Sequence, residues 1–110
     1  MTNITLLYEE RKIKGFEIAG HSGWGTHGND ILCSSISSVS WFVLSLLTDR
    51  LEDKYFTFID GSGYYYLEVS KEQIDLHPFL WYILVQFEKF AIELEHQYPE
   101  HVIVLRHEGE

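Results

Sequence analysis

The sequence predicts a single α/β domain over residues 1–110, an α/β/α sandwich with a mixed sheet of about five strands and two helices. The first observation is length, because 110 residues suit one domain. The second is that short β-branched and aromatic runs alternate with two long segments of helical periodicity, in the order β-β-α-β-β-α-β. The third is that the middle strands are apolar on both faces, which is typical of strands covered by helices.

The first two strands are expected at residues 4–8 and 13–19, which are both mainly apolar. The charged residues 9–12 between them form a short turn. The two strands therefore predict a hairpin, although this turn lacks the Asn-Gly signal. The second strand ends at Ala19 and leads directly into Gly20 and His21.

A helix is expected next, with Asn29 or Asp30 as its cap and residues 49–54 leading out of it. Apolar residues recur in this segment at helical spacing. They are Ile36, Val39, Trp41, Phe42, Val43, Leu46 and Leu47. Four serines make the first half of the helix narrow and fairly polar, so another backbone or a ligand can approach it closely.

Two further strands, at residues 55–60 and 64–70, are separated by Gly61-Ser62-Gly63, which is a strong signal for a tight turn. Both strands are apolar or aromatic on both faces. A strand that is covered on one face only alternates between apolar and polar residues. We therefore expect cover on both faces by helices. Two layers, with dimerisation covering the other face of the sheet, are the alternative.

A second long helix is expected from Phe79 to Tyr98, with Pro78 at its first turn. Its first half is apolar all round, which predicts deep packing or an interface. Its second half is amphipathic, and Pro99 ends it. Residues 102–106 then form the last strand.

The composition narrows the class of protein. A formal net charge of −9 argues against a nucleic-acid surface, which needs clustered Lys and Arg. The single cysteine forms no internal disulfide, and no secretory signal is visible, so we expect a cytoplasmic protein. The longest uninterrupted apolar run, Phe79 to Val85, is too short to cross a bilayer. We expect no direct nucleic-acid partner and no membrane partner.

The stretch from Gly20 to Ser37 joins a strand end to a helix start through a glycine-rich loop. If Asp30 is the N-cap, Cys33 is the third helical residue, beside unpaired N–H groups and the positive end of the helix dipole. Both features favour the thiolate, and the same N–H groups can hold an oxyanion. His21 can reach the thiol across the loop. The pattern therefore predicts a Cys/His nucleophile site.

Three other interpretations of this stretch stay open. A buried cysteine is commonly inert. Residues 23–28 match the G-x-G-x-x-G pattern of dinucleotide-binding folds, although no strand ending in an acidic residue follows about twenty residues later. His21, His27 and Cys33 are residue types that bind zinc, although the sequence has no CxxC or HxxxH pair.

These residues also resemble the signature of a known family, the ribosomal-processing cysteine protease family Prp. The family pattern is roughly G-H-A, a short loop and G-x-D-[IV]-[VL]-C-A-x-x-S. The matching residues are Gly20-His21-Ser22, Gly28-Asn29-Asp30-Ile31-Leu32-Cys33-Ser34 and Ser37. The chain length and the element order also match, so the resemblance covers the whole chain. Ser22 and Ser34 stand where the family usually has alanine, and both changes leave the Cys/His pair intact.

The resemblance implies a cysteine endopeptidase that removes a short N-terminal extension from protein twenty-seven of the large ribosomal subunit, cutting after a pair of bulky residues. By motif position, His21 would be the catalytic base and Cys33 the nucleophile, with Asp30 and Ser37 as supporting residues. The glycine-rich loop would close over the substrate. Its residues include Gly20, Ser22, Gly23, Gly25 and Gly28. The resemblance also implies a homodimer, and we expect no cofactor and no bound metal.

A second function from another class stays open beside the protease. It is a non-catalytic dimeric binding module that uses the acidic surface and the aromatic strands. The reactivity of Cys33 separates the two, because a thiol activated by a helix start reacts fast with an alkylating agent at mildly acidic pH.

Overall fold

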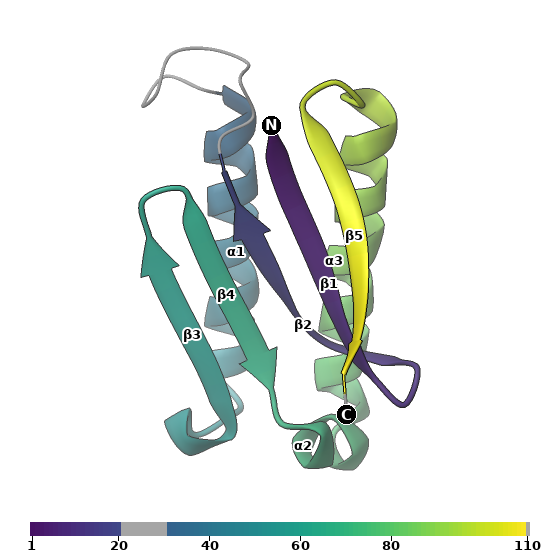
Figure 1. Ribbon diagram of the computed structural model, residues 1–110. Coiled ribbons are helices and arrows are strands. Elements are labelled where there is room, and N and C mark those ends of the chain that lie inside the picture. Colours follow the sequence, from purple (N-terminus) through teal and green to yellow (C-terminus); the bar gives the residue numbers. More distant parts are fainter. Residues whose placement is uncertain (21–30, 110) are drawn as a thin grey trace.

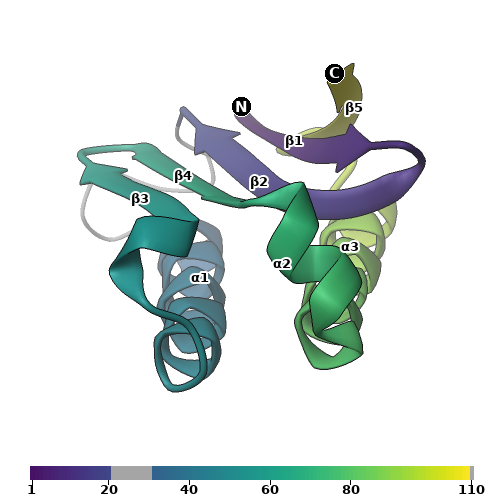
Figure 2. The ribbon, with the colours of Figure 1, turned by 90° about the horizontal axis from the view of Figure 1, so that it is seen from below.

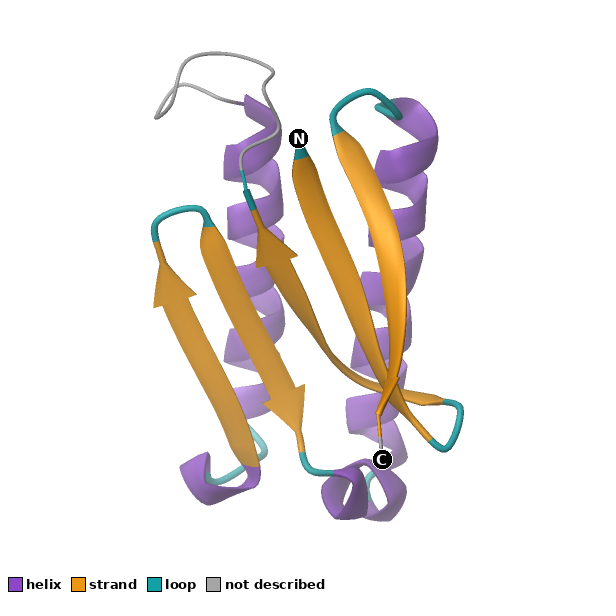
Figure 3. Ribbon diagram, in the orientation of Figure 1, coloured by secondary structure: helices purple, strands orange, loops and turns teal. Residues whose placement is uncertain are grey.

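The computed structural model describes residues 1–20 and 31–109 and contains the predicted strands and helices, with two short helices added (Figures 1 and 3). Residues 21–30 and 110 lie outside the described part. The elements are β1 (Thr2–Glu9), β2 (Lys12–Ala19), α1 (Ile31–Thr48), the 3₁₀-helix η1 (Asp53–Tyr55), β3 (Phe56–Gly61), β4 (Tyr64–Val69), α2 (Lys71–Leu76), α3 (Pro78–Gln97) and β5 (Val102–Gly109).

The five strands form one mixed sheet in the order β3-β4-β2-β1-β5. β1 pairs antiparallel with β2, where Leu6 lies opposite Phe16, and parallel with β5, where Thr2 lies opposite Val102. β4 pairs antiparallel with both β2 and β3. The predicted hairpin and the predicted mixed sheet of five strands are therefore confirmed.

The structure corrects the predicted layering, because α1, α2 and α3 all lie on one face of the sheet (Figure 2). The α/β class holds, but the domain has two layers in place of an α/β/α sandwich. On the face of the sheet without helices, the aromatic residues of β4 are not explained by burial under a helix. There Tyr64 Oη donates a hydrogen bond to Glu17 Oε2 over 2.6 Å, so the polar end of this aromatic side chain has a partner at the solvent-facing surface.

A bulge in the β1–β2 hairpin turns two large residues of β2 toward the helices. Gly15 and Ile13 pair with successive residues of β1, so Lys14 between them has no pairing partner in that strand. As a result Ile13 and Phe16 are both buried. Phe16 stacks on Phe87 of α3, with ring centroids 3.8 Å apart, at the centre of the core.

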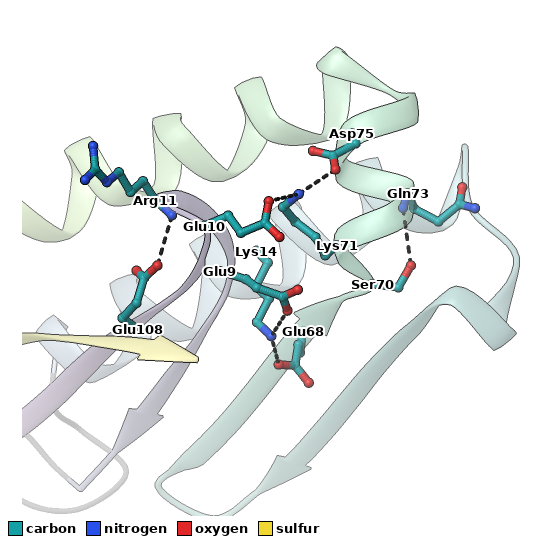
Figure 4. A network of polar contacts seen from close by, with 10 residues as sticks. All are labelled: Glu9, Glu10, Arg11, Lys14, Glu68, Ser70, Lys71, Gln73, Asp75 and Glu108. Atoms are coloured by element: carbon teal, nitrogen blue, oxygen red, sulfur yellow. Dashed lines mark hydrogen bonds and ion pairs between the residues drawn. The ribbon is translucent and has the colours of Figure 1, made fainter. Parts of the chain in front are cut away.

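Lys14 uses this bulged position to connect the hairpin with β4 (Figure 4). Its Nζ lies 2.9 Å from Glu9 Oε1 and 3.0 Å from Glu68 Oε2. Burial lowers the pKa of Lys14, but the hydrogen bonds to the two carboxylates outweigh burial and raise it above its usual range. The ammonium therefore stays charged between β1 and β4.

Helix α2 is absent from the sequence prediction, which continues β4 to residue 70 and places the next helix after Pro78. The Ser70 side chain caps α2 by accepting a hydrogen bond from the Gln73 N–H over 3.3 Å (Figure 4). Six residues are too few to show a helical period, so the cap is the one local signal. Pro78 is confirmed in the first turn of α3.

Helix α1 is long and apolar enough, by length and composition alone, to cross a membrane, with a mean hydropathy of 1.8. It is the one described helix with this property. A search for uninterrupted apolar runs overlooks it because serines separate its apolar residues. In this fold α1 packs against α3 and the sheet, and it contributes Leu32, Ile36 and Val43 to the core.

Candidate functional site

The end of β2 and the start of α1 lie at the same end of the molecule (Figure 1). β2 ends at Ala19 and α1 begins at Ile31. The sequence predicts a strand end before residues 21–30 and a helix start after them, and β2 and α1 confirm both predictions. The candidate site therefore lies where β2 of the sheet and α1 of the helix layer come together.

Gly20 occupies a backbone position at the strand end that only glycine fits. Its φ is +93°, in the region that residues with side chains rarely adopt. A Cβ at this position would lie 2.6 Å from the carbonyl oxygen of Met1. The Gly20 N–H donates to the Gly63 carbonyl over 2.9 Å, so the exit of β2 is tied to the turn between β3 and β4.

Cys33 is the third residue of α1, as predicted, and its side chain is half-buried. The first-turn N–H groups of a helix have no partner within the helix, and the helix dipole places partial positive charge there. Both effects favour a thiolate over a thiol. The sulfur therefore lies neither deep in the core nor far from the helix start, which is the placement that the nucleophile hypothesis requires.

Ser37 lies one turn after Cys33 and reaches a residue that the sequence prediction does not include. Its Oγ lies 2.5 Å from Tyr65 Oη, within hydrogen-bonding distance, and both side chains are half-buried. Tyr65 projects from the helix-facing side of β4, as Leu67 does two residues later. Only the pairing of β4 beside β2 brings this phenol to α1, so no local signal predicts it.

The remaining predicted site residues lie outside the described part of the chain. They are His21, Ser22, Gly23, Gly25, Gly28 and Asp30. Of the predicted site, the structure thus places Gly20, Cys33 and Ser37. The distance between Cys33 and His21, and the capping role of Asp30, stay predictions.

The alternative interpretations gain no support from the described residues. Residues 1–20 and 31–109 contain no cluster of three His, Cys, Asp or Glu side chains that could hold a metal ion. The zinc interpretation depends on His21 and His27, which lie outside these ranges. A dinucleotide-binding unit needs the strand after the helix to run parallel beside the first strand. Here β3 pairs with β4, and β4 separates it from β2.

A family model described as cysteine protease Prp matches residues 1–103 of the chain. The chain belongs to this family. This match confirms the predicted enzyme class, a cysteine protease. It also confirms the resemblance to the Prp family that rests on the motifs around His21 and Cys33. No curated protein sequence matches the chain.

Several solved structures share the fold over almost the whole chain. One is an essential ribosomal processing protease Prp from S. aureus with a covalently linked product peptide, at 18% identity and a TM-score of 0.78, covering 97% of this chain and 100% of that one. The same protein with a substrate peptide gives 15% identity and a TM-score of 0.77, with the same coverage. SMU.848 from Streptococcus mutans gives 21% identity and a TM-score of 0.75, covering 99% and 96%. At these identities the likeness shows the fold.

Proposed function

We propose that this protein is a cysteine endopeptidase that removes a short N-terminal extension from protein twenty-seven of the large ribosomal subunit. The observation that carries the proposal is the half-buried Cys33 in the first turn of α1, in a chain of the cysteine protease Prp family. The class of substrate is supported by the S. aureus structures, whose protein is described as a ribosomal processing protease bound to substrate and product peptides.

In the proposed reaction His21 takes the proton of the Cys33 thiol, and the sulfur forms a bond to the carbon of the scissile carbonyl. Backbone N–H groups of the first turn of α1 stabilise the resulting oxyanion. The C–N bond then breaks, and His21 gives its proton to the leaving amine. Water next attacks the thioester carbon, and His21 takes the proton of this water. The C–S bond then breaks, the new carboxylate leaves, and His21 returns the proton to sulfur, which restores the thiol.

The supporting residues have roles that follow from their positions. Asp30 precedes α1 directly, and we propose that its carboxylate caps the helix and so fixes the first turn that carries Cys33. Ser37 lies on the same face of α1 one turn later. We propose that the glycine-rich segment after Gly20 closes over the peptide. We also propose that the reaction takes place in the cytoplasm.

The charge of the protein suits a basic substrate. The formal net charge is −9, with 17 acidic residues against 8 Lys and Arg. Such a surface attracts a basic ribosomal-protein tail and accelerates its encounter with the site, an effect that salt weakens. Raising the ionic strength should therefore slow cleavage of a basic peptide more than cleavage of a neutral one.

The decisive experiment compares Cys33→Ala and His21→Ala with the unchanged protein on a peptide that carries the ribosomal-protein extension. Mass spectrometry follows the cleaved products. Each variant should lose activity by about 10³-fold or more, because nucleophile and base act as one unit. Ser34→Ala is the matched control: it changes the exposed neighbour to the family's usual residue and should keep the activity. Undiminished cleavage by either site variant contradicts the proposal.

We further propose that the protein is a homodimer that meets its second copy through the helix layer. A groove of about 350 Å³ runs between α1 and α3, and its lining is almost wholly apolar. It is lined by Val39, Phe42, Val43, Leu46, Phe79, Tyr82, Ile83, Gln86, Phe87 and Phe90. Phe42 is 63% exposed and Tyr82 is 59% exposed beside this groove.

Charge favours a second copy as the occupant of this helix groove. Helix α1 has no charged residue between Ile31 and Thr48, although the whole chain carries −9. Two copies repel one another wherever their acidic surfaces approach, and least where uncharged helix faces meet. Exposed apolar patches of this kind mark interaction sites.

The second candidate function, a non-catalytic binding module that uses the acidic surface and the aromatic strands, shares this proposed homodimer. The reaction of Cys33 with iodoacetamide at about pH 6 separates the two functions. A protease thiol at a helix start reacts fast at this pH. A thiol that reacts no faster than free cysteine, in a protein that cleaves no ribosomal peptide, would favour the binding module.

A further inference from the structure

We propose that Tyr65 is a positioning residue of the protease site, whose phenol holds Ser37 and the first two turns of α1 against β4. The inference rests on the proposed function and adds a residue from a different element to it. Tyr65 Oη and Ser37 Oγ lie 2.5 Å apart. Both side chains are half-buried, so water competes less with this hydrogen bond than it would on an open surface.

The position of Ser37 on α1 connects this hydrogen bond to the thiol. Residues four apart lie on the same face of a helix, with Cβ atoms about 5–6 Å apart. Cys33 and Ser37 have this spacing. Since Ser37 faces the phenol of Tyr65, Cys33 lies on the same side of α1, one turn closer to the helix start. The Tyr65 contact therefore orients the face of α1 that carries the sulfur.

The position of Tyr65 in the sheet connects the same bond to the other half of the site. Tyr65 lies opposite Ile18 in the pairing of β4 with β2. Two residues after Ile18, just beyond the end of β2, the Gly20 N–H donates to the carbonyl of Gly63, which directly precedes β4. β4 therefore contacts Ser37 through Tyr65, and the residue directly before β4 binds the end of β2. One bond joins the helix of the nucleophile to the strands that lead to the proposed base.

Other serines of α1 show what Ser37 would do without the phenol. Ser35 Oγ donates to the Ile31 carbonyl over 3.0 Å, and Ser40 Oγ donates to the Ile36 carbonyl over 2.8 Å. This bond to the fourth preceding residue is the usual choice of a serine inside a helix. For Ser37 it would lead back to the Cys33 carbonyl. Ser37 Oγ also lies within hydrogen-bonding distance of Tyr65 Oη, so its hydroxyl has a partner on the sheet side of the site.

Tyr65→Phe tests the proposal, with Tyr64→Phe as the matched control. The control removes a phenol from the adjacent residue, which points to the opposite face and donates to Glu17. Loss of one hydrogen bond should lower kcat for the ribosomal peptide about three- to tenfold in Tyr65→Phe, with KM within about twofold. Alkylation of Cys33 by iodoacetamide should also need a higher pH in Tyr65→Phe. Tyr64→Phe should match the unchanged protein in each measurement.

Ser37→Ala and the double variant show whether the two residues act as one unit. The double variant should lose no more activity than the more damaged single variant. Equal kinetics and alkylation profiles for Tyr65→Phe and the unchanged protein, or losses that multiply in the double variant, would overturn the inference. If the unchanged protein cleaves no ribosomal peptide, the proposed function fails, while the alkylation profiles still test Tyr65. If Tyr65→Phe fails to fold, an unshifted profile in Ser37→Ala overturns the inference.

Discussion

The rings of Phe16 and Phe87 stack almost parallel, with centroids 3.8 Å apart and an angle of 14° between their planes. Phe16 comes from the strand that leads to the site, and Phe87 comes from the middle of α3. Both are fully buried. This pair joins the sheet to the helix layer, so the position of β2 depends on it.

Phe87→Ala should destabilise the fold strongly. Removing a buried phenylalanine loses its transfer free energy and leaves a cavity, which together cost about 3–5 kcal/mol of the free energy of unfolding. Urea denaturation followed by circular dichroism measures the loss. Leu105→Ala is the control, because Leu105 is 46% exposed on β5 and should change the free energy of unfolding by less than about 1 kcal/mol. Equal losses would show that Phe87 is not a core residue.

Gly20→Ala should cost stability out of proportion to the size of a methyl group. The substitution forces a side chain into a positive φ and against the Met1 carbonyl oxygen at 2.6 Å, with a cost of about 1–3 kcal/mol. Thermal and urea unfolding measure this. In Gly61→Ala the nearest heavy atom, Tyr64 Cβ, lies 4.0 Å away and φ needs no change, so this control should be tolerated. A Gly20 variant as stable as the Gly61 variant would contradict the strained backbone.

Stability should fall as the pH rises from about 10 to 12. Burial, together with a hydrogen bond to Glu88, raises the pKa of Tyr8 to about 12 from its usual 10. A hydrogen bond to Glu17 similarly raises the pKa of Tyr64 to about 12. Between these pH values the unfolded chain releases phenol protons that the folded chain keeps, so the free energy of unfolding declines.

The contribution of Tyr8 to this decline can be isolated. Tyr8→Phe removes the phenol and should show a shallower loss of stability between pH 10 and pH 12 than the unchanged protein. Urea unfolding at several pH values in this window gives both slopes. Parallel slopes for the two proteins would mean that Tyr8 titrates alike in the folded and unfolded states.

Tyr82→Glu should convert the proposed homodimer into a monomer. The substitution places a carboxylate at the helix groove, and a charge buried without a partner at an interface costs several kcal/mol. Sedimentation velocity over a range of protein concentrations measures the mass. Leu105→Glu, on β5, is the control and should stay dimeric. A dimer of unchanged affinity in Tyr82→Glu would place the interface elsewhere.

Local patterns were enough to predict most elements. The Gly-Ser-Gly turn before Tyr64, the proline at position 78 and the helical period of residues 36–47 each act within a few residues along the chain. For the same reason the first-turn position of Cys33 could be predicted, because a helix start depends on neighbouring residues. The family motif follows from the sequence alone in the same way.

The layering and the Tyr65 contact depended on the tertiary structure. Aromatic residues on both faces of β4 are compatible with two covering layers or with one. The placement of all three α-helices on one face of the sheet decides for one layer. The hydroxyl partners of these aromatic residues are Glu17 on one face and Ser37 on the other. Those partners lie 47 and 28 residues away in sequence. The hydrophobic periodicity of a single strand or helix cannot predict hydrogen bonds between residues so far apart in the sequence.

The sequence by itself determined the enzyme family, the element order and the position of a cysteine at a helix start, because each depends on residues close together in the chain. Only the tertiary structure decided that the helices share one face of the sheet and that β4 lies beside β2. Strand order is set by which apolar faces pack together across the whole domain. That packing brings the phenol of Tyr65 to the helix of Cys33.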